Sequence, residues 1–125
     1  SETVETMAFL EEVFIIKKIM KEIFDLKLLG TIIIFGSYAK RTFRKDSDID
    51  LFYLGELNDK DVQNIRTICE IYGKTINVKK STLKNFESGL RKKDPLIIEV
   101  IKSHIILQNP EQFVNPLWRY YDERR

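Results

Sequence analysis

Two aspartates one residue apart, Asp48 and Asp50, begin an apolar stretch that continues to Leu54. The alternation of charged and apolar residues predicts a β-strand, in which residues i and i+2 project from one face with Cα atoms about 6.6 Å apart. Carboxylates at that separation suit Mg²⁺, which takes one or two carboxylates and completes its shell with water and phosphate oxygens. They can also hold two ions, although an exposed Asp-x-Asp is equally compatible with a solvated strand end.

A Gly-Ser pair, Gly36 and Ser37, is separated from Asp48 by ten residues. It follows Thr31–Phe35, a continuous and largely β-branched stretch that predicts a central strand covered on both faces. Gly36 lets the chain turn sharply and approach a ligand without a Cβ atom in the way. A helical turn after it would direct free backbone N–H groups and the Ser37 hydroxyl toward an anion. We therefore expect a phosphate site at the end of this strand.

Four cations lie in the link between the glycine turn and the aspartates: Lys40, Arg41, Arg44 and Lys45. A bound phosphate needs positive charge nearby, and this short link keeps the four side chains within reach of the turn. A Gly-Ser turn in a basic surface loop is the simpler interpretation of these residues by themselves. The turn, the basic link and the aspartates on an adjacent strand together favour a metal-dependent nucleotide site.

The pattern Gly36-Ser37, ten residues, Asp48-Ile49-Asp50 resembles the signature of the DNA polymerase beta-like nucleotidyltransferases. It is similar in particular to the minimal nucleotidyltransferases, which are often paired with a HEPN partner protein. The blocks "GSYAK" and "SDIDL" carry the match, and the order of elements from residue 3 to about 107 fits that fold. The resemblance implies an α+β fold like the palm of polymerase beta, with a small mixed sheet flanked by helices and a long N-terminal helix.

The resemblance also implies the chemistry. Gly36 and Ser37 would hold the triphosphate of ATP. Asp48 and Asp50 would be the catalytic residues and would coordinate two Mg²⁺ ions. AMP would pass to a hydroxyl of a partner protein, with pyrophosphate leaving, and the acceptor would be a tyrosine of a HEPN toxin that the protein neutralises. The remaining nucleotide-binding residues implied by the resemblance are Lys40, Arg41 and Arg44.

Three positions depart from the family pattern. Lys40 stands where the family often has Arg, and Arg41 stands where a glycine often follows. The family's third acid, on the next strand, aligns with Asn77, which brings no negative charge and cannot act as a base. Glu99 is another acid that we consider for this role. Asn77 leaves open a second interpretation, a catalytically impaired antitoxin subunit that binds nucleotide or partner only.

A third interpretation is RNA or DNA binding through Lys40–Lys45 and Arg91–Lys93, with Tyr38, Phe43 or Trp118 stacking on bases. The formal net charge of the whole chain is only +2. So small an excess of positive charge argues against nucleic acid as the main partner.

A long helix from about residue 3 to residue 28, ended by Gly30, should precede the first strand. Its apolar residues cover more of the helix surface than one buried face requires. The helix is therefore either buried on most sides or also packs on a second subunit, as in a homodimer. The predicted inner stripe consists of Met7, Leu10, Phe14, Ile19, Ile23 and Leu26.

The elements predicted after the aspartate strand are a helix at 58–73, a strand at 75–80, a helix at 81–93, a helix capped by Asp94 and a strand at 104–107. Asn58 is the expected N-cap and Gly73 the expected end of the first of these helices. Cys69 should be a core thiol. His104 has no partner at metal-binding spacing and should be structural.

At 125 residues the chain is large enough for one domain with a real core. We divide it into an N-terminal helix (1–30), a catalytic core (31–107) and an aromatic C-terminal extension (108–125). The extension contains two Asn-Pro pairs, which are predicted to interrupt its secondary structure. We expect the extension either to close over the core or to form an interface. The single cysteine fits a reducing compartment. We expect no membrane span or signal peptide and place the protein in the cytoplasm.

Overall fold

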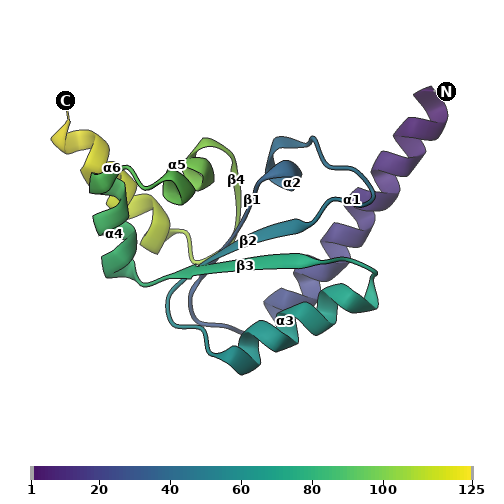
Figure 1. The fold of residues 1–125 in the computed structure, drawn as a ribbon, viewed down its shortest axis with the longest axis horizontal. Coiled ribbons are helices and arrows are strands. Elements are labelled where there is room, and N and C mark those ends of the chain that lie inside the picture. The colour runs from purple at the N-terminus through teal and green to yellow at the C-terminus, as the bar shows by residue number, and fades with distance from the viewer. Residues whose placement is uncertain (1, 125) are drawn as a thin grey trace.

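The computed structural model describes residues 2–124 and contains a four-stranded sheet with six helices around it (Figure 1). This confirms the predicted α+β class, the small mixed sheet and the long N-terminal helix. In chain order the elements are α1 (Glu2–Asp25), β1 (Thr31–Phe35), α2 (Ser37–Lys40), β2 (Ile49–Leu54), α3 (Asp59–Ile71), β3 (Ile76–Ser81), α4 (Leu83–Lys92), α5 (Pro95–Lys102), β4 (His104–Gln108) and α6 (Glu111–Glu123). No helix within residues 2–124 is long and apolar enough to cross a membrane.

The strand order is β3-β2-β1-β4, so β1 is central, as its apolar sequence predicts. It pairs antiparallel with both β2 and β4, while β2 and β3 are parallel. The register places Phe35 at the end of β1 opposite Asp50 at the start of β2, and Asp50 opposite Asn77 on β3. Three strands therefore bring their site residues to the same end of the sheet.

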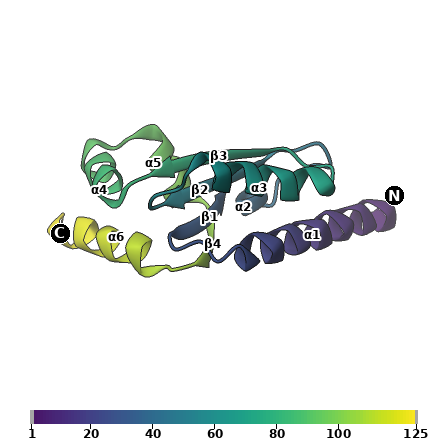
Figure 2. The same cartoon turned by 90° about the horizontal axis from the view of Figure 1, so that it is seen from below.

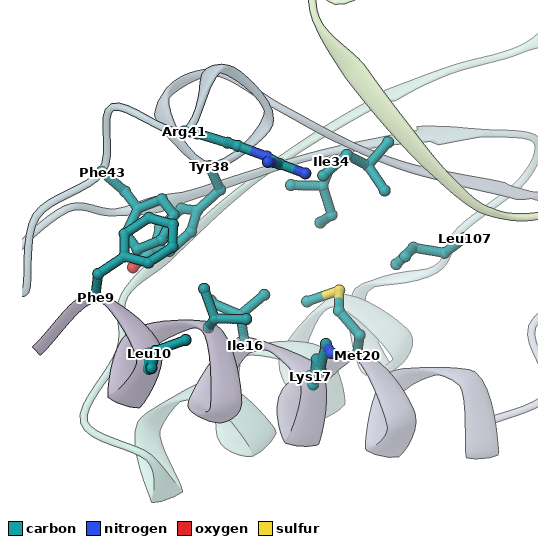
Figure 3. A pocket seen from close by; sticks show the side chains of 12 residues that line it. Phe9, Leu10, Ile16, Lys17, Met20, Ile34, Tyr38, Arg41, Phe43 and Leu107 are labelled. Atoms are coloured by element: carbon teal, nitrogen blue, oxygen red, sulfur yellow. The ribbon is translucent and has the colours of Figure 1, made fainter. Parts of the chain in front are cut away.

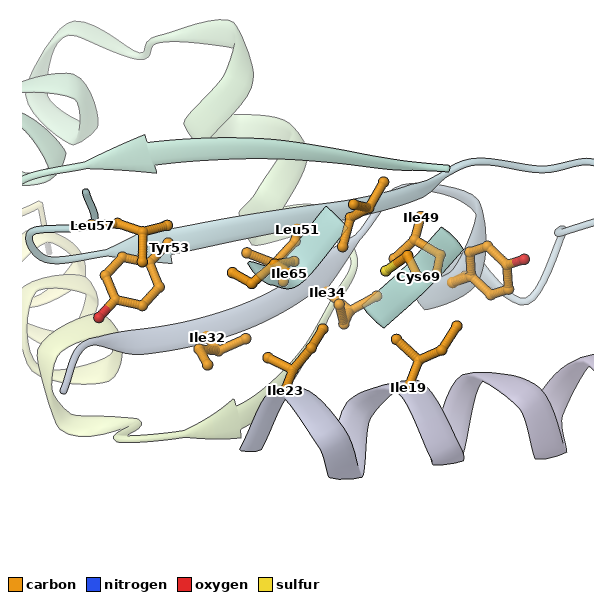
Figure 4. Close-up of a cluster of buried hydrophobic side chains, with 12 residues drawn as sticks. Ile19, Ile23, Ile32, Ile34, Ile49, Leu51, Tyr53, Leu57, Ile65 and Cys69 are labelled. Carbon is orange, nitrogen blue, oxygen red and sulfur yellow. The ribbon is translucent and has the colours of Figure 1, made fainter. Parts of the chain in front are cut away.

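The two faces of the sheet bury separate cores, because alternate residues of a strand point to opposite faces. One core joins Ile32, Ile34 and Leu51 to α1 and α3, as Figure 4 shows. The other joins the alternate side chains, such as Phe35 and Phe52, to α4, α5 and α6. Figure 2 shows these two groups of helices at opposite ends of the elongated molecule.

Helix α1 begins where the sequence predicts but ends earlier, and three residues of its predicted inner stripe are exposed. It ends at Asp25, and Lys27 rather than a glycine adopts the left-handed conformation that follows, with φ 55°. Of the predicted inner stripe, Ile19 and Ile23 are fully buried. The N-terminal end of the helix extends past the sheet (Figure 1), and several apolar residues of this part of the helix are exposed. Met7, Leu10 and Phe14 are 59%, 54% and 63% exposed.

Gly30 does not end the helix as predicted, but allows a close approach. Its N–H donates to the hydroxyl of Tyr53 at 2.7 Å. A Cβ atom at this position would lie 2.5 Å from the carbonyl oxygen of Leu54 and 2.5 Å from the Tyr53 ring. The glycine therefore lets the segment before β1 lie directly on the end of β2.

The C-terminal extension is a helix, α6, that passes through the second Asn-Pro pair without ending. The predicted break at Asn115-Pro116 is wrong, because Pro116 lies inside the helix and is buried together with Phe113. Pro110, in the first pair, is the N-cap. The helix partly closes over the core, but leaves Trp118 71% exposed.

The remaining local predictions are confirmed. The Asn58 side chain accepts from the N–H of Asp61 at 2.8 Å, and the Asp94 side chain accepts from Leu96 and Ile97. Cys69 is fully buried, and burial, with a smaller effect of Glu70, raises the pKa of its thiol to about 12. His104 Nδ1 lies 3.1 Å from two carbonyl oxygens at the end of α5, which fits a structural residue.

We predict that Gly30→Ala lowers the free energy of unfolding by about 1–3 kcal/mol, because the new methyl group meets backbone and a buried ring. Gly89→Ala is the control, since its Cβ would meet side-chain atoms of Ile97 and Asp94 rather than backbone, the closest being the terminal Cδ1 of Ile97, and alanine favours the helix by ~1 kcal/mol. Urea unfolding measures both. Equal effects of the two substitutions would contradict the role assigned to Gly30.

Candidate active site

The backbone of Gly36 lies directly against the carboxylate of Asp50. Gly36 follows Phe35, which pairs with Asp50 across the antiparallel strands β1 and β2. Its φ is +70°, a left-handed conformation that favours glycine. A Cβ atom here would overlap Oδ2 of Asp50. Only glycine therefore lets the chain turn at the end of β1 while the carboxylate stays beside it.

Helix α2 is a single turn that starts at Ser37, as the sequence predicts for the segment after the glycine. The Lys40 N–H donates to the Gly36 carbonyl at 3.0 Å, and the Thr42 N–H donates to the Ser37 carbonyl at 3.0 Å. Ser37 is half-buried and Lys40 is exposed. The turn thus keeps the Ser37 hydroxyl and the first cation of the link close to the end of β1.

Asp48, Asp50 and Asn77 lie at adjoining positions at this end of the sheet. Asp48 immediately precedes β2 and is exposed, whereas Asp50 is half-buried. The Asn77 side chain donates through Nδ2 to Oδ1 of Asp50 at 3.2 Å. The place predicted for a third acid is therefore occupied by an amide that binds one of the carboxylates. This contact gives the Asp50 carboxylate a fixed orientation.

The oxygen-rich donor set fits a hard divalent cation that keeps part of its water. Mg²⁺ is commonly bound through one or two carboxylates, with water and phosphate oxygens completing the octahedron. Within residues 2–124, however, no group of three or more His, Cys, Asp or Glu side chains is arranged to hold a metal ion. Glu99, considered as a substitute acid, does not form such a group with Asp48 and Asp50.

The basic link does not place all its cations on the carboxylate side. Arg44 and Lys45 are exposed, and a turn from Arg44 to Ser47 is held by the Arg44 N–H bond to Ser47 Oγ at 2.7 Å. Arg41 instead lines a groove of about 510 Å³ between α1 and the sheet, together with Ile34 (Figure 3). Since Ile34 belongs to the face opposite that of Phe35, this groove is separate from the carboxylates.

Tyr38 is a buried residue of the site that sequence reasoning did not single out for this role. Its ring stacks on Phe43 of the link at 4.5 Å between centroids, and its hydroxyl donates to the Ser47 carbonyl at 3.4 Å. Burial raises its pKa to about 12, with smaller contributions from the charges of Glu12 and Asp48. Tyr38 therefore stays neutral, and it contacts the link at Phe43 and Ser47.

Sequence reasoning also did not identify a buried ion pair that lies next to the link. Lys74 and Glu12 are 6% and 8% exposed and bind each other. The signal in the sequence is that Glu12 lies on the same helical stripe as Ile19 and Ile23, seven and eleven residues before them. An acid on a buried stripe predicts a buried cation as its partner, but nothing in the sequence selects Lys74 among the many lysines.

Comparison with known proteins places this geometry in a family. Residues 16–112 match the family model described as "Polymerase beta, Nucleotidyltransferase". No curated protein matches the chain. Two solved structures similar to it are both 16% identical. One, a toxin-antitoxin with AMP-PNP, is covered over 87% of its length by 85% of this chain, with a TM-score of 0.54. The other, a mutant of the toxin-antitoxin MntA-HpeT, is covered over 77% by 77% of this chain, with a TM-score of 0.47.

The first of these structures supports the fold, and the family model extends over most of the chain, from the middle of α1 to the start of α6. It includes the glycine turn, the basic link, both aspartates and Asn77. The chain therefore belongs to the polymerase beta nucleotidyltransferase family.

Proposed function

We propose that this protein transfers AMP from ATP to a hydroxyl group of a partner protein in a Mg²⁺-dependent reaction. The observation that carries the proposal is the contact between the Gly36 turn and the Asp50 carboxylate. It brings together the turn that we assign to phosphate binding and a carboxylate that we assign to cation binding. Membership of the nucleotidyltransferase family supports this assignment. The similar toxin-antitoxin structure with AMP-PNP supports an adenine nucleotide as the donor.

Each group in the site has a role that suits phosphoryl-type transfer, which depends mainly on positioning and charge neutralisation. The Gly36 turn and Ser37 hold the triphosphate, and the exposed Lys40 and Arg44 neutralise part of its charge. Asp48 and Asp50 hold Mg²⁺, which supplies further positive charge at the phosphates. Arg41 lines the groove on the opposite face of the sheet, so it would reach the triphosphate only from a different side-chain conformation.

The reaction forms a bond between the acceptor oxygen and the α-phosphorus. The bond from that phosphorus to the bridging oxygen of the β-phosphate breaks in line, and pyrophosphate leaves. Asn77 cannot accept the proton of the acceptor hydroxyl. The proton therefore passes to solvent or to a base that the partner supplies.

The partner that we propose is a HEPN-type toxin, which this protein would neutralise as an antitoxin in the cytoplasm. Pairing with a toxin is supported by the similar solved structure, which is a toxin-antitoxin. The HEPN class rests on the resemblance of the "GSYAK" and "SDIDL" blocks to minimal nucleotidyltransferases. The exposed Met7, Leu10 and Phe14 on α1 are available to a partner or to a second copy.

A second candidate is a subunit that binds nucleotide and partner without transferring AMP. The observation in its favour is the hydrogen bond from Asn77 to Asp50, which puts a neutral amide where a third acid would stand. Such a subunit would neutralise the toxin by occlusion alone.

Label transfer tests the proposal and separates it from the second candidate. The purified protein is mixed with Mg²⁺, α-labelled ATP and lysate of its source cells, and γ-labelled ATP is used in parallel. We expect a protein band labelled from the α position only, since pyrophosphate carries the γ label away. The band should disappear in Asp48→Asn/Asp50→Asn, which lacks both carboxylates.

The matched control is Asp59→Asn/Asp61→Asn, which removes two acids at the same spacing from the first turn of α3. It should label the band like the wild type. Binding of Mg-ATP without any labelled band would reject transfer and leave the second candidate, whereas absence of both binding and labelling would reject both.

Asn77→Asp should increase AMP transfer by roughly 10-fold to 100-fold, because it adds a carboxylate beside Asp50 that can act as a base. The rate is measured with a saturating acceptor at fixed Mg²⁺. Asn85→Asp, on the exposed surface of α4, makes the same chemical change elsewhere and should leave the rate as it is. A rate unchanged or lowered by Asn77→Asp would contradict this role for the position.

Gly36→Ala should weaken binding of Mg-AMP-PNP at least about 10-fold, because its Cβ would displace the Asp50 carboxylate. Gly73→Ala is the matched control, since Gly73 has the same φ of +70° but no atom within 4 Å of a Cβ. Both variants should lose ~1 kcal/mol or more of stability from backbone strain. Equal affinities in calorimetric titrations of the two variants would contradict the importance of the Gly36–Asp50 contact.

A further inference from the structure

The buried ion pair between Glu12 and Lys74 joins α1 to the turn between α3 and β3. Both side chains are almost fully removed from solvent, at 10% and 5% exposure. The position of Lys74 is fixed by its own backbone, since its N–H donates to the Cys69 carbonyl at 2.9 Å. Two elements far apart in the sequence thus meet in this polar contact, next to the basic link.

Lys74 also reaches the link itself. Its Nζ donates to the backbone carbonyl of Lys45 at 2.8 Å. Lys45 follows Arg44 and lies three residues before Asp48. An ammonium group has three donors, so Lys74 can bind Glu12 and hold the backbone of the link at the same time.

An aromatic stack holds the link from α1 at a second point. Phe43 of the link stacks on Phe9 of α1 at 5.1 Å and on Tyr38 at 4.5 Å between ring centroids. Figure 3 shows the three rings together at one end of the groove. With the Tyr38 hydroxyl bond to Ser47, the link is attached at residues 43, 45 and 47.

A requirement for stability does not explain the pair, because apolar residues of similar volume often stabilise a core as well as a buried ion pair or better. Apolar side chains could not hold the Lys45 carbonyl, however. We propose that Glu12 and Lys74 are positioning residues for nucleotide binding, which fix the link that carries Arg44 and leads to Asp48 before the triphosphate arrives. This inference rests on the proposed function.

The test replaces the pair by apolar residues, in Glu12→Leu/Lys74→Met, and measures the affinity for Mg-AMP-PNP and the urea midpoint. We expect the midpoint to be retained and the dissociation constant to rise about 10-fold, because binding must then order the link. Hydrogen exchange should become faster at residues 41–48. Lys74→Arg, which keeps the charge and the donors, should bind nearly as tightly as the wild type.

The matched control is Glu87→Leu/Arg119→Met, which makes the same type of change in an exposed ion pair between α4 and α6. It should leave the affinity as it is. If the apolar pair does not fold, Glu12→Gln/Lys74→Gln replaces it, because glutamine is polar but uncharged and shorter than lysine, which weakens the bond to the Lys45 carbonyl. The same 10-fold loss is expected.

Wild-type affinity in folded Glu12→Leu/Lys74→Met or folded Glu12→Gln/Lys74→Gln would overturn the inference while leaving the proposed function intact. The reference experiment is the wild type beside Asp48→Asn/Asp50→Asn. If the wild type does not bind Mg-AMP-PNP, or if both bind it equally, the proposed function itself fails.

Discussion

The antiparallel register of β1 and β2 determines where the charges of the site can lie. It sets Phe35 opposite Asp50, so the residue after Phe35 must pass beside the carboxylate, and Gly36 is the residue type that fits. A shift of one residue would turn Asp50 to the face that packs on α1 and α3, and would turn Ile49 and Leu51 away from that core. The buried cores on both faces of the sheet therefore hold the carboxylate at the glycine turn.

The parallel pairing of β3 with β2 extends the same constraint to Asn77. Because this register is set by Ile49 opposite Ile76 and Leu51 opposite Val78, the polar residues between them must face each other. The hydrogen bond from Asn77 to Asp50 then follows from the apolar pattern of two strands. The same strand register therefore determines both the packing of the core and the positions of the site residues.

Strands and caps could be predicted because their signals are local. The β-branched stretch before Gly36, the Asn58 cap and the Asp94 cap each depend on a few neighbouring residues, and the structure has them as expected. The end of α1 and the identity of the lysine that binds Glu12 could not be predicted. They depend on where the sheet stops beneath the helix and on a lysine 62 residues away, and the sequence carries no signal for such distances.

In the proposed function, binding of a nucleotide and transfer of AMP depend on different groups of the site. Two carboxylates lie near a link whose four cations form no ion pair with an acid within residues 2–124. In the proposed function a triphosphate would bring negative charge to these cations, which would favour its binding even with few metal ligands. The proposed transfer would need in addition a group that takes a proton from the acceptor, and the position where we expected a third acid carries the amide of Asn77. A partner that carries its own base beside the acceptor hydroxyl would restore what Asn77 omits, and would make the reaction depend on the complex rather than on this chain by itself.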